Sequence, residues 1–82
     1  MEKEIIYNLN FLYFDDVNKE VLHFFSTSYK TLEEARKDLE LLKKWTPEDK
    51  EILPWWLLFD RFRYKHENII YDYKIEPTVF YH

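Results

Sequence analysis

The sequence predicts an α+β fold in which one amphipathic helix packs on one face of a small antiparallel sheet made of two hairpins. Apolar residues recur at every second position near both ends of the chain, which is typical of strands. Between these regions they recur at helical spacing, and turns rich in Asp and Asn separate the predicted strands. The expected order is strand, strand, helix, short helix, strand, strand. With 82 residues, the chain is expected to form a single domain, residues 1–82.

Residues 4–27 are predicted to form the first hairpin. The first strand, residues 4–15, has one completely apolar face made of Ile5, Tyr7, Leu9, Phe11 and Tyr13. The segment Asp-Asp-Val-Asn-Lys at 15–19 is typical of a turn, because Asp and Asn side chains bond to their own backbone. Residues 20–27 are rich in Val, Phe and Thr and are predicted to form the second strand. Since the connection lacks glycine, a loop of four or five residues is expected instead of a two-residue turn.

A helix is predicted from about Leu32 to Trp45. Thr31 and Glu34 match a capping box, in which the threonine hydroxyl accepts from the amide of residue 34 and the glutamate returns to the amide of Thr31. One apolar stripe follows at helical spacing: Leu32, Ala35, Leu39, Leu42 and Trp45. Acidic residues come first and basic residues last, which suits the helix dipole.

A second, short helix is predicted to begin at Thr46. The sequence Thr-Pro-Glu-Asp supplies a cap, a proline at the first helical position and two acids. Pro54 limits this helix to about two turns, because proline disfavours helical geometry at the residue before it.

Residues 54–60 are compatible with a helix, a strand or a loop. As a helix they would align Trp55 with Leu58, and as a strand they would align Trp56 with Leu58. The alternation in 61–65 favours a strand over the second half of this region.

The final strand is predicted to begin after a turn at 66–68. Ile69, Tyr71, Tyr73 and Ile75 share one face of this strand. Pro77 is expected to end the strand or to mark an edge, and residues 78–82 to form a short extension.

The composition excludes several classes of function. The chain has no cysteine and no glycine, which excludes disulfides, cysteine-ligated metals and glycine-rich phosphate loops. The three histidines lack metal-ligand spacing, so neither a metal site nor a cofactor is expected. His23 and Ser26 fall on opposite faces of a strand, which is a poor geometry for a nucleophile and its base. The chain is therefore predicted not to be an enzyme.

Three basic residues, Arg61, Arg63 and Lys65, share one predicted strand face, while Phe62 and Tyr64 point the other way. Single-strand binders combine a cationic groove with aromatic platforms, but here the two kinds of side chain lie on opposite faces. Asp72, Lys74 and Glu76 on the next strand are also available to pair with the basic residues. With a net charge of −4, nucleic-acid binding is the less favoured hypothesis.

The aromatic content of 21% is more than a thin core needs. If Trp56 and Leu58 face the helix, then Trp55, Leu57 and Phe59 form an exposed patch beside the basic face, and such patches mark protein contacts. The alternative is that residues 46–59 fold back as a lid and bury this patch. The predicted partner-binding residues are Trp55, Leu57, Phe59, Arg61, Arg63 and Lys65.

The favoured hypothesis is a small non-enzymatic protein-binding domain. The alternatives are a nucleic-acid-binding accessory protein that uses the basic face, and a homodimer closed by the aromatic patch. Residues with AT-rich codons (Phe, Tyr, Met, Ile, Asn and Lys) number 34, against one Ala and no Gly. This bias suggests a phage- or plasmid-encoded inhibitor that occupies the surface of a host or defence protein.

A cytoplasmic location is expected because the N-terminal region lacks the apolar segment of a signal peptide. The longest apolar run, 52–59, contains a proline and is too short to span a bilayer, so no membrane partner is expected.

Overall fold

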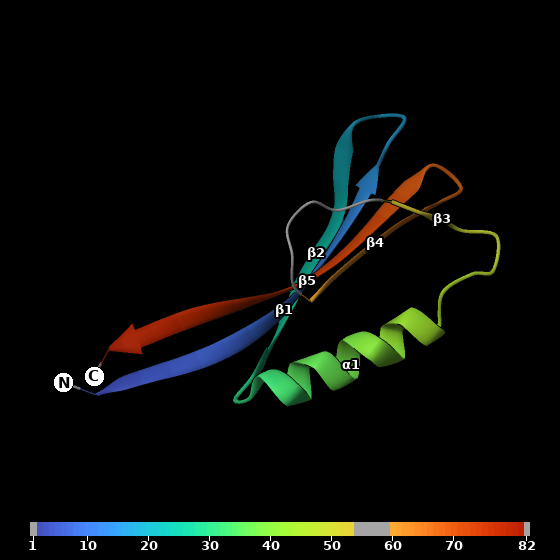
Figure 1. Cartoon of the computed structure of the whole chain (residues 1–82). Helices are drawn as coiled ribbons and strands as arrows, with labels where there is room; N and C mark the ends of the chain where they lie inside the picture. Colours follow the sequence, from blue (N-terminus) through green and yellow to red (C-terminus); the bar gives the residue numbers. More distant parts are fainter. Residues whose placement is uncertain (1, 54–59, 82) are drawn as a thin grey trace.

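A computed structural model describes residues 2–53 and 60–81, which form one antiparallel five-stranded sheet and one helix (Figure 1). The elements are, in chain order, β1 (Lys3–Asp15), β2 (Glu20–Tyr29), α1 (Leu32–Lys44), β3 (Glu51–Ile52), β4 (Arg61–His66) and β5 (Ile69–Tyr81). Within the sheet the order is β2-β1-β5-β4-β3. The predicted α+β class, an antiparallel sheet with one helix, is confirmed, whereas the finer arrangement differs: β3 adds a fifth strand to the two predicted hairpins, and the predicted short helix is not found in 46–53.

The two longest strands, β1 and β5, form the centre of the sheet. They pair antiparallel along their whole length, from Lys3 opposite Tyr81 to Asp15 opposite Ile69. This pairing joins the β1/β2 hairpin to the β4/β5 hairpin in one continuous sheet. Because β1 and β5 each have 13 residues, the molecule is elongated, with dimensions of 48 × 25 × 21 Å. The two ends of the chain lie side by side (Figure 1).

The β1–β2 connection has the predicted length, with four residues between Asp15 and Glu20. The carboxylate of Asp15 accepts hydrogen bonds from the amides of Val17 at 2.9 Å and Asn18 at 3.1 Å. This is the local backbone capture that makes Asp favourable in turns. Lys19 completes the reversal with a positive φ of 57°.

Strand β5 continues through Pro77, where the sequence predicted an end or an edge. The amide of Ile75 donates to the carbonyl of Asp60 on the β4 side, at 3.0 Å. Backbone groups alternate along a strand, so the nitrogen of Pro77 points to the same side. Pairing with β4 ends at Lys74 opposite Arg61, so the missing amide hydrogen costs no ladder bond. Pro77 therefore marks a local edge, as one of the two expectations stated.

Helix α1 begins at the predicted cap, although the Glu34 carboxylate bonds to the hydroxyl of Thr31 and not to its amide as predicted. Thr31 accepts a hydrogen bond from the amide of Glu34 at 3.2 Å, and its hydroxyl donates to the Glu34 carboxylate at 3.0 Å. The helix ends at Lys44, and the amide of Trp45 donates to the carbonyl of Leu42. Trp45 was predicted to belong to the apolar stripe, and this is wrong because its side chain is 84% exposed. At about 100° per residue, position 45 lies beside 38 and 41, roughly a quarter turn away from the buried Ala35 and Leu39.

The predicted second helix at 46–53 is absent from this part of the chain, which the structure describes in full. A turn leads instead into β3, where Glu51 and Ile52 pair with Lys65 and Tyr64 of β4. A helix of two turns without an apolar stripe is marginal, since its backbone bonds barely offset the cost of nucleation. Pairing with β4 satisfies the same backbone groups and extends the sheet. Residues 54–59, for which helix, strand and loop were all considered, lie outside the described residues.

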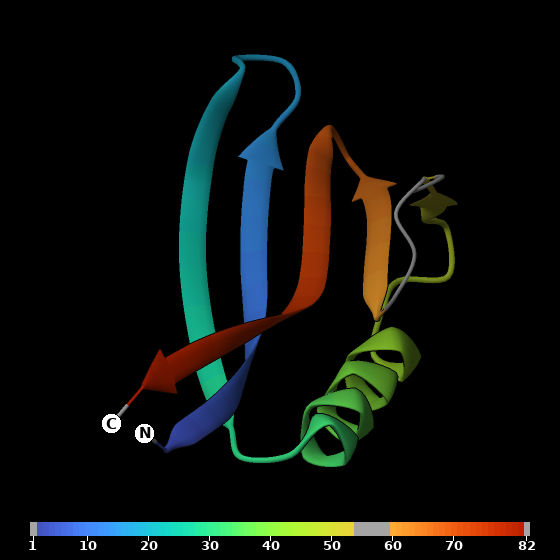
Figure 2. The same ribbon diagram turned by 60° about the vertical axis from the view of Figure 1, so that its left-hand side comes forward.

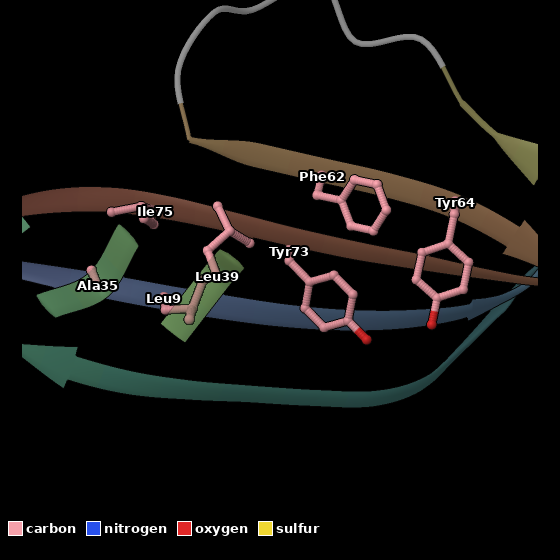
Figure 3. Packing of buried hydrophobic residues seen from close by; sticks show 7 residues of the cluster. All are labelled: Leu9, Ala35, Leu39, Phe62, Tyr64, Tyr73 and Ile75. Atoms are coloured by element: carbon pink, nitrogen blue, oxygen red, sulfur yellow. The ribbon is translucent and has the colours of Figure 1, made fainter. Parts of the chain in front are cut away.

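The core lies between α1 and one face of the sheet (Figures 2 and 3). Its buried residues are Leu9, Ala35, Leu39, Phe62, Tyr64, Tyr73 and Ile75. Ala35 and Leu39 of α1 lie over Leu9 and Ile75, while the aromatic residues extend the core along β4 and β5 (Figure 3). The faces predicted for the strands are confirmed here, because every buried strand residue belongs to the predicted apolar face. The opposite face of the sheet carries Asn8, Asp72 and the basic side chains of β4.

Candidate protein-binding surfaces

The apolar anchors predicted from the sequence, Trp55, Leu57 and Phe59, lie outside the described residues. The three basic residues of the same prediction lie on β4, on the sheet face opposite α1. These basic residues are surrounded by carboxylates from other elements, as the following contacts show.

Asp72 of β5 forms ion pairs with two of the three basic side chains. Arg61 donates from Nε to one oxygen of Asp72 at 3.1 Å and from Nη2 to the other at 2.7 Å. The Nε atom of Arg63 lies 3.6 Å from the same carboxylate. The two parallel hydrogen bonds raise the pKa of Arg61 above its ordinary value. The predicted cross-strand pairing with Asp72 is therefore present.

Lys65 pairs with a residue far away in the sequence. Its Nζ donates to Asp16, in the β1–β2 turn, at 2.9 Å, and Lys19 contacts the other oxygen of Asp16 at 2.8 Å. Hydrogen bonds from Lys19 and Lys65 lower the pKa of Asp16 to about 2. The basic face of β4 is thus tied into internal ion pairs and offers less free positive charge to a phosphate than the sequence suggests.

The sheet face toward α1 carries two rows of aromatic rings that cross four strands. In the first row the ring centroids of Phe62 and Tyr73 are 6.5 Å apart, those of Tyr73 and Phe11 5.4 Å, and those of Phe11 and Phe25 5.4 Å. The second row consists of Tyr64, Tyr71, Tyr13 and His23, with successive centroids 4.6, 4.9 and 5.6 Å apart. Sequence reasoning missed these rows because they depend on the register of β1 against β5.

Both aromatic rows end at β2, which is an edge of the sheet. Phe62 is 6% exposed at the β4 end of its row, whereas Phe25 is 51% exposed at the β2 end. On the opposite face of the same strand Phe24 is 62% exposed. The alternation of β2 could have revealed this, since it places aromatic side chains on both faces of one strand.

A groove of about 250 Å³ lies between α1 and strands β1 and β2. It is lined by Leu9, Phe11, Tyr29, Asp38, Leu41, Leu42 and Trp45. Leu41 and the strongly exposed Trp45 stand at the helix side of this groove. The hydroxyl of Tyr29 donates to the carboxylate of Asp38, and burial together with this bond raises the pKa of Tyr29 to about 12.

Charge is divided between the two flanks of α1. Glu34, Asp38, Leu41 and Trp45 follow one another at helical spacing on the flank that borders the groove. On the other flank Arg36 pairs with Asp60 at 2.8 Å, and Lys43 lies 5.8 Å from the ring centre of Phe62. The groove is therefore apolar inside and acidic at its rim.

Neither a metal centre nor a membrane span is found in 2–53 and 60–81. In these residues no three side chains of a metal-ligating kind gather at one place. The helix described here lacks the length and the apolar composition needed to cross a bilayer.

Comparisons with known proteins found no match: no protein-family model, no curated protein and no solved structure is significantly similar to this chain.

Proposed function

We propose that this chain is a non-enzymatic protein-binding domain that captures a partner in the groove between α1 and strands β1 and β2. The observation that carries the proposal is Trp45, which is 84% exposed at the rim of an apolar groove. Tryptophan is among the residues that supply most of the binding energy at protein interfaces, where a pocket beside it is filled by the partner. Leu41, 46% exposed on the same flank, enlarges this apolar surface.

The groove suits a side chain of another protein better than a cofactor. Its volume of about 250 Å³ is below the roughly 300 Å³ at which small-molecule sites usually begin. Asp38 in the groove and Glu34 on the same flank favour a partner that carries positive charge. The partner segment we expect is therefore one large apolar side chain flanked by Lys or Arg.

The AT-rich codon bias adds the finer proposal of a phage- or plasmid-encoded inhibitor of a host or defence protein, acting in the cytoplasm. Occupation of a partner's surface would be sufficient for inhibition, without chemistry. Trp55, Leu57 and Phe59 remain proposed as a second apolar contact. The ion pairs of Arg61, Arg63 and Lys65 favour this protein-binding role over the nucleic-acid alternative.

Selection of peptides from a random display library against the immobilised full chain tests the groove directly. We expect the enriched peptides to carry one aromatic or large aliphatic residue next to Lys or Arg. Trp45→Ala should weaken their binding at least tenfold, and Asp38→Asn should weaken chiefly the basic peptides. Tyr81→Ala is the matched control, because Tyr81 is a comparably exposed aromatic residue (68%) outside the groove lining. Peptides that bind the Trp45→Ala variant as well as the parent chain would contradict the proposal.

A tagged pull-down from bacterial lysate, with and without nuclease, then compares the same variants. A stoichiometric protein that survives nuclease and is lost with Trp45→Ala would identify the partner. A signal that disappears with nuclease would favour the nucleic-acid alternative.

A further inference from the structure

The outer edge of β2 lacks the features that usually prevent a sheet edge from pairing. From Val21 to Tyr29 the strand reads Val-Leu-His-Phe-Phe-Ser-Thr-Ser-Tyr, with no Lys, Arg, Asp, Glu or Pro. Natural edge strands are commonly protected by charges, prolines, short length or bulges. Here the protection is limited to one irregularity, a bulge at Leu22, where Tyr13 pairs with His23 and Phe14 with Val21.

The opposite edge of the sheet is protected. Strand β3 has two residues, one of which is the charged Glu51. Among the described residues, none lies beyond β2, which forms the outer margin of the sheet (Figure 2). The two edges of the sheet therefore differ in protection, and β2 is the edge that is open to a partner strand.

We propose that β2 pairs antiparallel with β2 of a second copy of this chain, so that the two sheets join into one. In such a pair a twofold axis perpendicular to the sheet keeps the faces of both copies aligned, so residues that face the same side meet. With Phe25 on the axis, His23 meets Thr27 of the second copy on the α1 side, and Phe24 meets Ser26 of the second copy on the other side.

The uncharged strand is compatible with pairing to its own copy. A strand without charges meets its own copy without like-charge repulsion. A basic peptide would find no acidic residue between Val21 and Tyr29, and this favours a second copy over a charged partner.

The first aromatic row also continues across the axis. The row Phe62, Tyr73, Phe11 and Phe25 ends half-exposed at β2. Phe25 of the second copy would occupy the next position, and the same row would then run back through the second sheet in reverse order. The exposed half of Phe25 would be covered by its own counterpart. This surface does not involve Trp45 or Asp38, so the proposal stands independently of the hetero partner.

Cross-linking through a single introduced cysteine tests this pairing, because the chain has no cysteine of its own. Residues opposite each other in an antiparallel pair have Cα atoms about 4.5–5.5 Å apart, which is within disulfide range. The full chain with Phe25→Cys is expected to form a covalent dimer rapidly under mild oxidation. Val79→Cys is the matched control, since Val79 is exposed (41%) on β5 and far from β2 in the sheet.

Sedimentation of the parent chain provides a second test that leaves the aromatic rows untouched. A monomer–dimer equilibrium that depends on protein concentration is expected.

Three results would overturn the proposal. They are a monomeric parent chain up to high micromolar concentration, Phe25→Cys cross-linking no faster than Val79→Cys, and an oligomer larger than a dimer, which a twofold pair of β2 strands does not form. Peptide binding in the α1 groove that persists in a monomeric chain would leave the proposed hetero partner intact while removing the β2 pairing.

Discussion

At the scale of single residues, two carboxylates decide what the basic face of β4 can do. Asp72 neutralises Arg61 and lies beside Arg63, and Asp16 binds Lys65 and Lys19. The sequence predicted the first of these contacts from strand neighbours. The second was not predicted, because Asp16 and Lys65 are 49 residues apart in the chain. Charges that seemed available for a ligand therefore link β4 to β5 and to the β1–β2 turn.

The Asp16 contacts predict a pH dependence of stability. The pKa of Asp16 is lowered from 3.8 to about 2 in the folded chain, so between these values the unfolded state binds more protons. The free energy of unfolding contributed by Asp16 is present above pH 4 and is lost as the pH falls toward 2. Asp16→Asn should flatten the decline of stability in this window, measured by urea unfolding from pH 5 to pH 2. Glu48→Gln, at an exposed carboxylate, is the control, and an unchanged slope in Asp16→Asn would contradict the assignment.

Substitutions of Leu39 in α1 and of Trp45 at its C-terminal end should differ strongly in their effect on the free energy of unfolding. Trp45→Ala should change the free energy of unfolding by no more than about 0.5 kcal/mol, because the side chain is 84% exposed. Leu39→Ala should cost about 2–5 kcal/mol, because Leu39 is 2% exposed and its removal leaves a cavity. Chemical denaturation of the two variants measures both. A loss of several kcal/mol in Trp45→Ala would show that this residue belongs to the core, and the groove proposal would lose its anchor.

At the scale of elements, α1 is specified locally, whereas the strands depend on one another. The cap at Thr31, the buried Ala35 and Leu39 and the helix end at Lys44 all follow from residues within one short segment. Strand β3 illustrates the opposite case, because its residues were predicted to be helical. They adopt a strand since β4 offers a free edge beside them.

The helix cap predicts a measurable loss. Thr31→Ala removes the oxygen that accepts from the amide of Glu34 and should lower the free energy of unfolding by about 1 kcal/mol. Thr31→Ser keeps this oxygen and should retain most of the stability. Thermal and urea unfolding of both variants checks the difference. Equal losses in the two variants would mean that the methyl group of Thr31, and not its hydroxyl, stabilises the helix start.

At the scale of the whole molecule, the net charge and the neutralised face of β4 together predict weak binding of nucleic acid. A chain with net charge −4 and paired basic residues should give no change in fluorescence anisotropy with a labelled single-stranded oligonucleotide at 0.15 M salt. Removing two acidic partners, in Asp16→Asn with Asp72→Asn, should produce weak binding at low salt that disappears as salt rises. Micromolar binding by the parent chain, falling steeply with salt, would restore the nucleic-acid hypothesis.

Residue order alone determined the helix and its cap, the β1–β2 turn and the inward faces of β1, β4 and β5, because these features depend on neighbours a few positions apart. Only the tertiary structure decided that β1 pairs with β5, that β2 is left as the open edge, and that Trp45 stands beside a groove. The physical reason is that the register between distant strands is set by the sum of contacts formed when the chain closes on itself. The groove beside Trp45 and the open edge of β2 form only when distant segments of the chain come together. The alternation of residues along each strand could therefore identify the core face but not these binding surfaces.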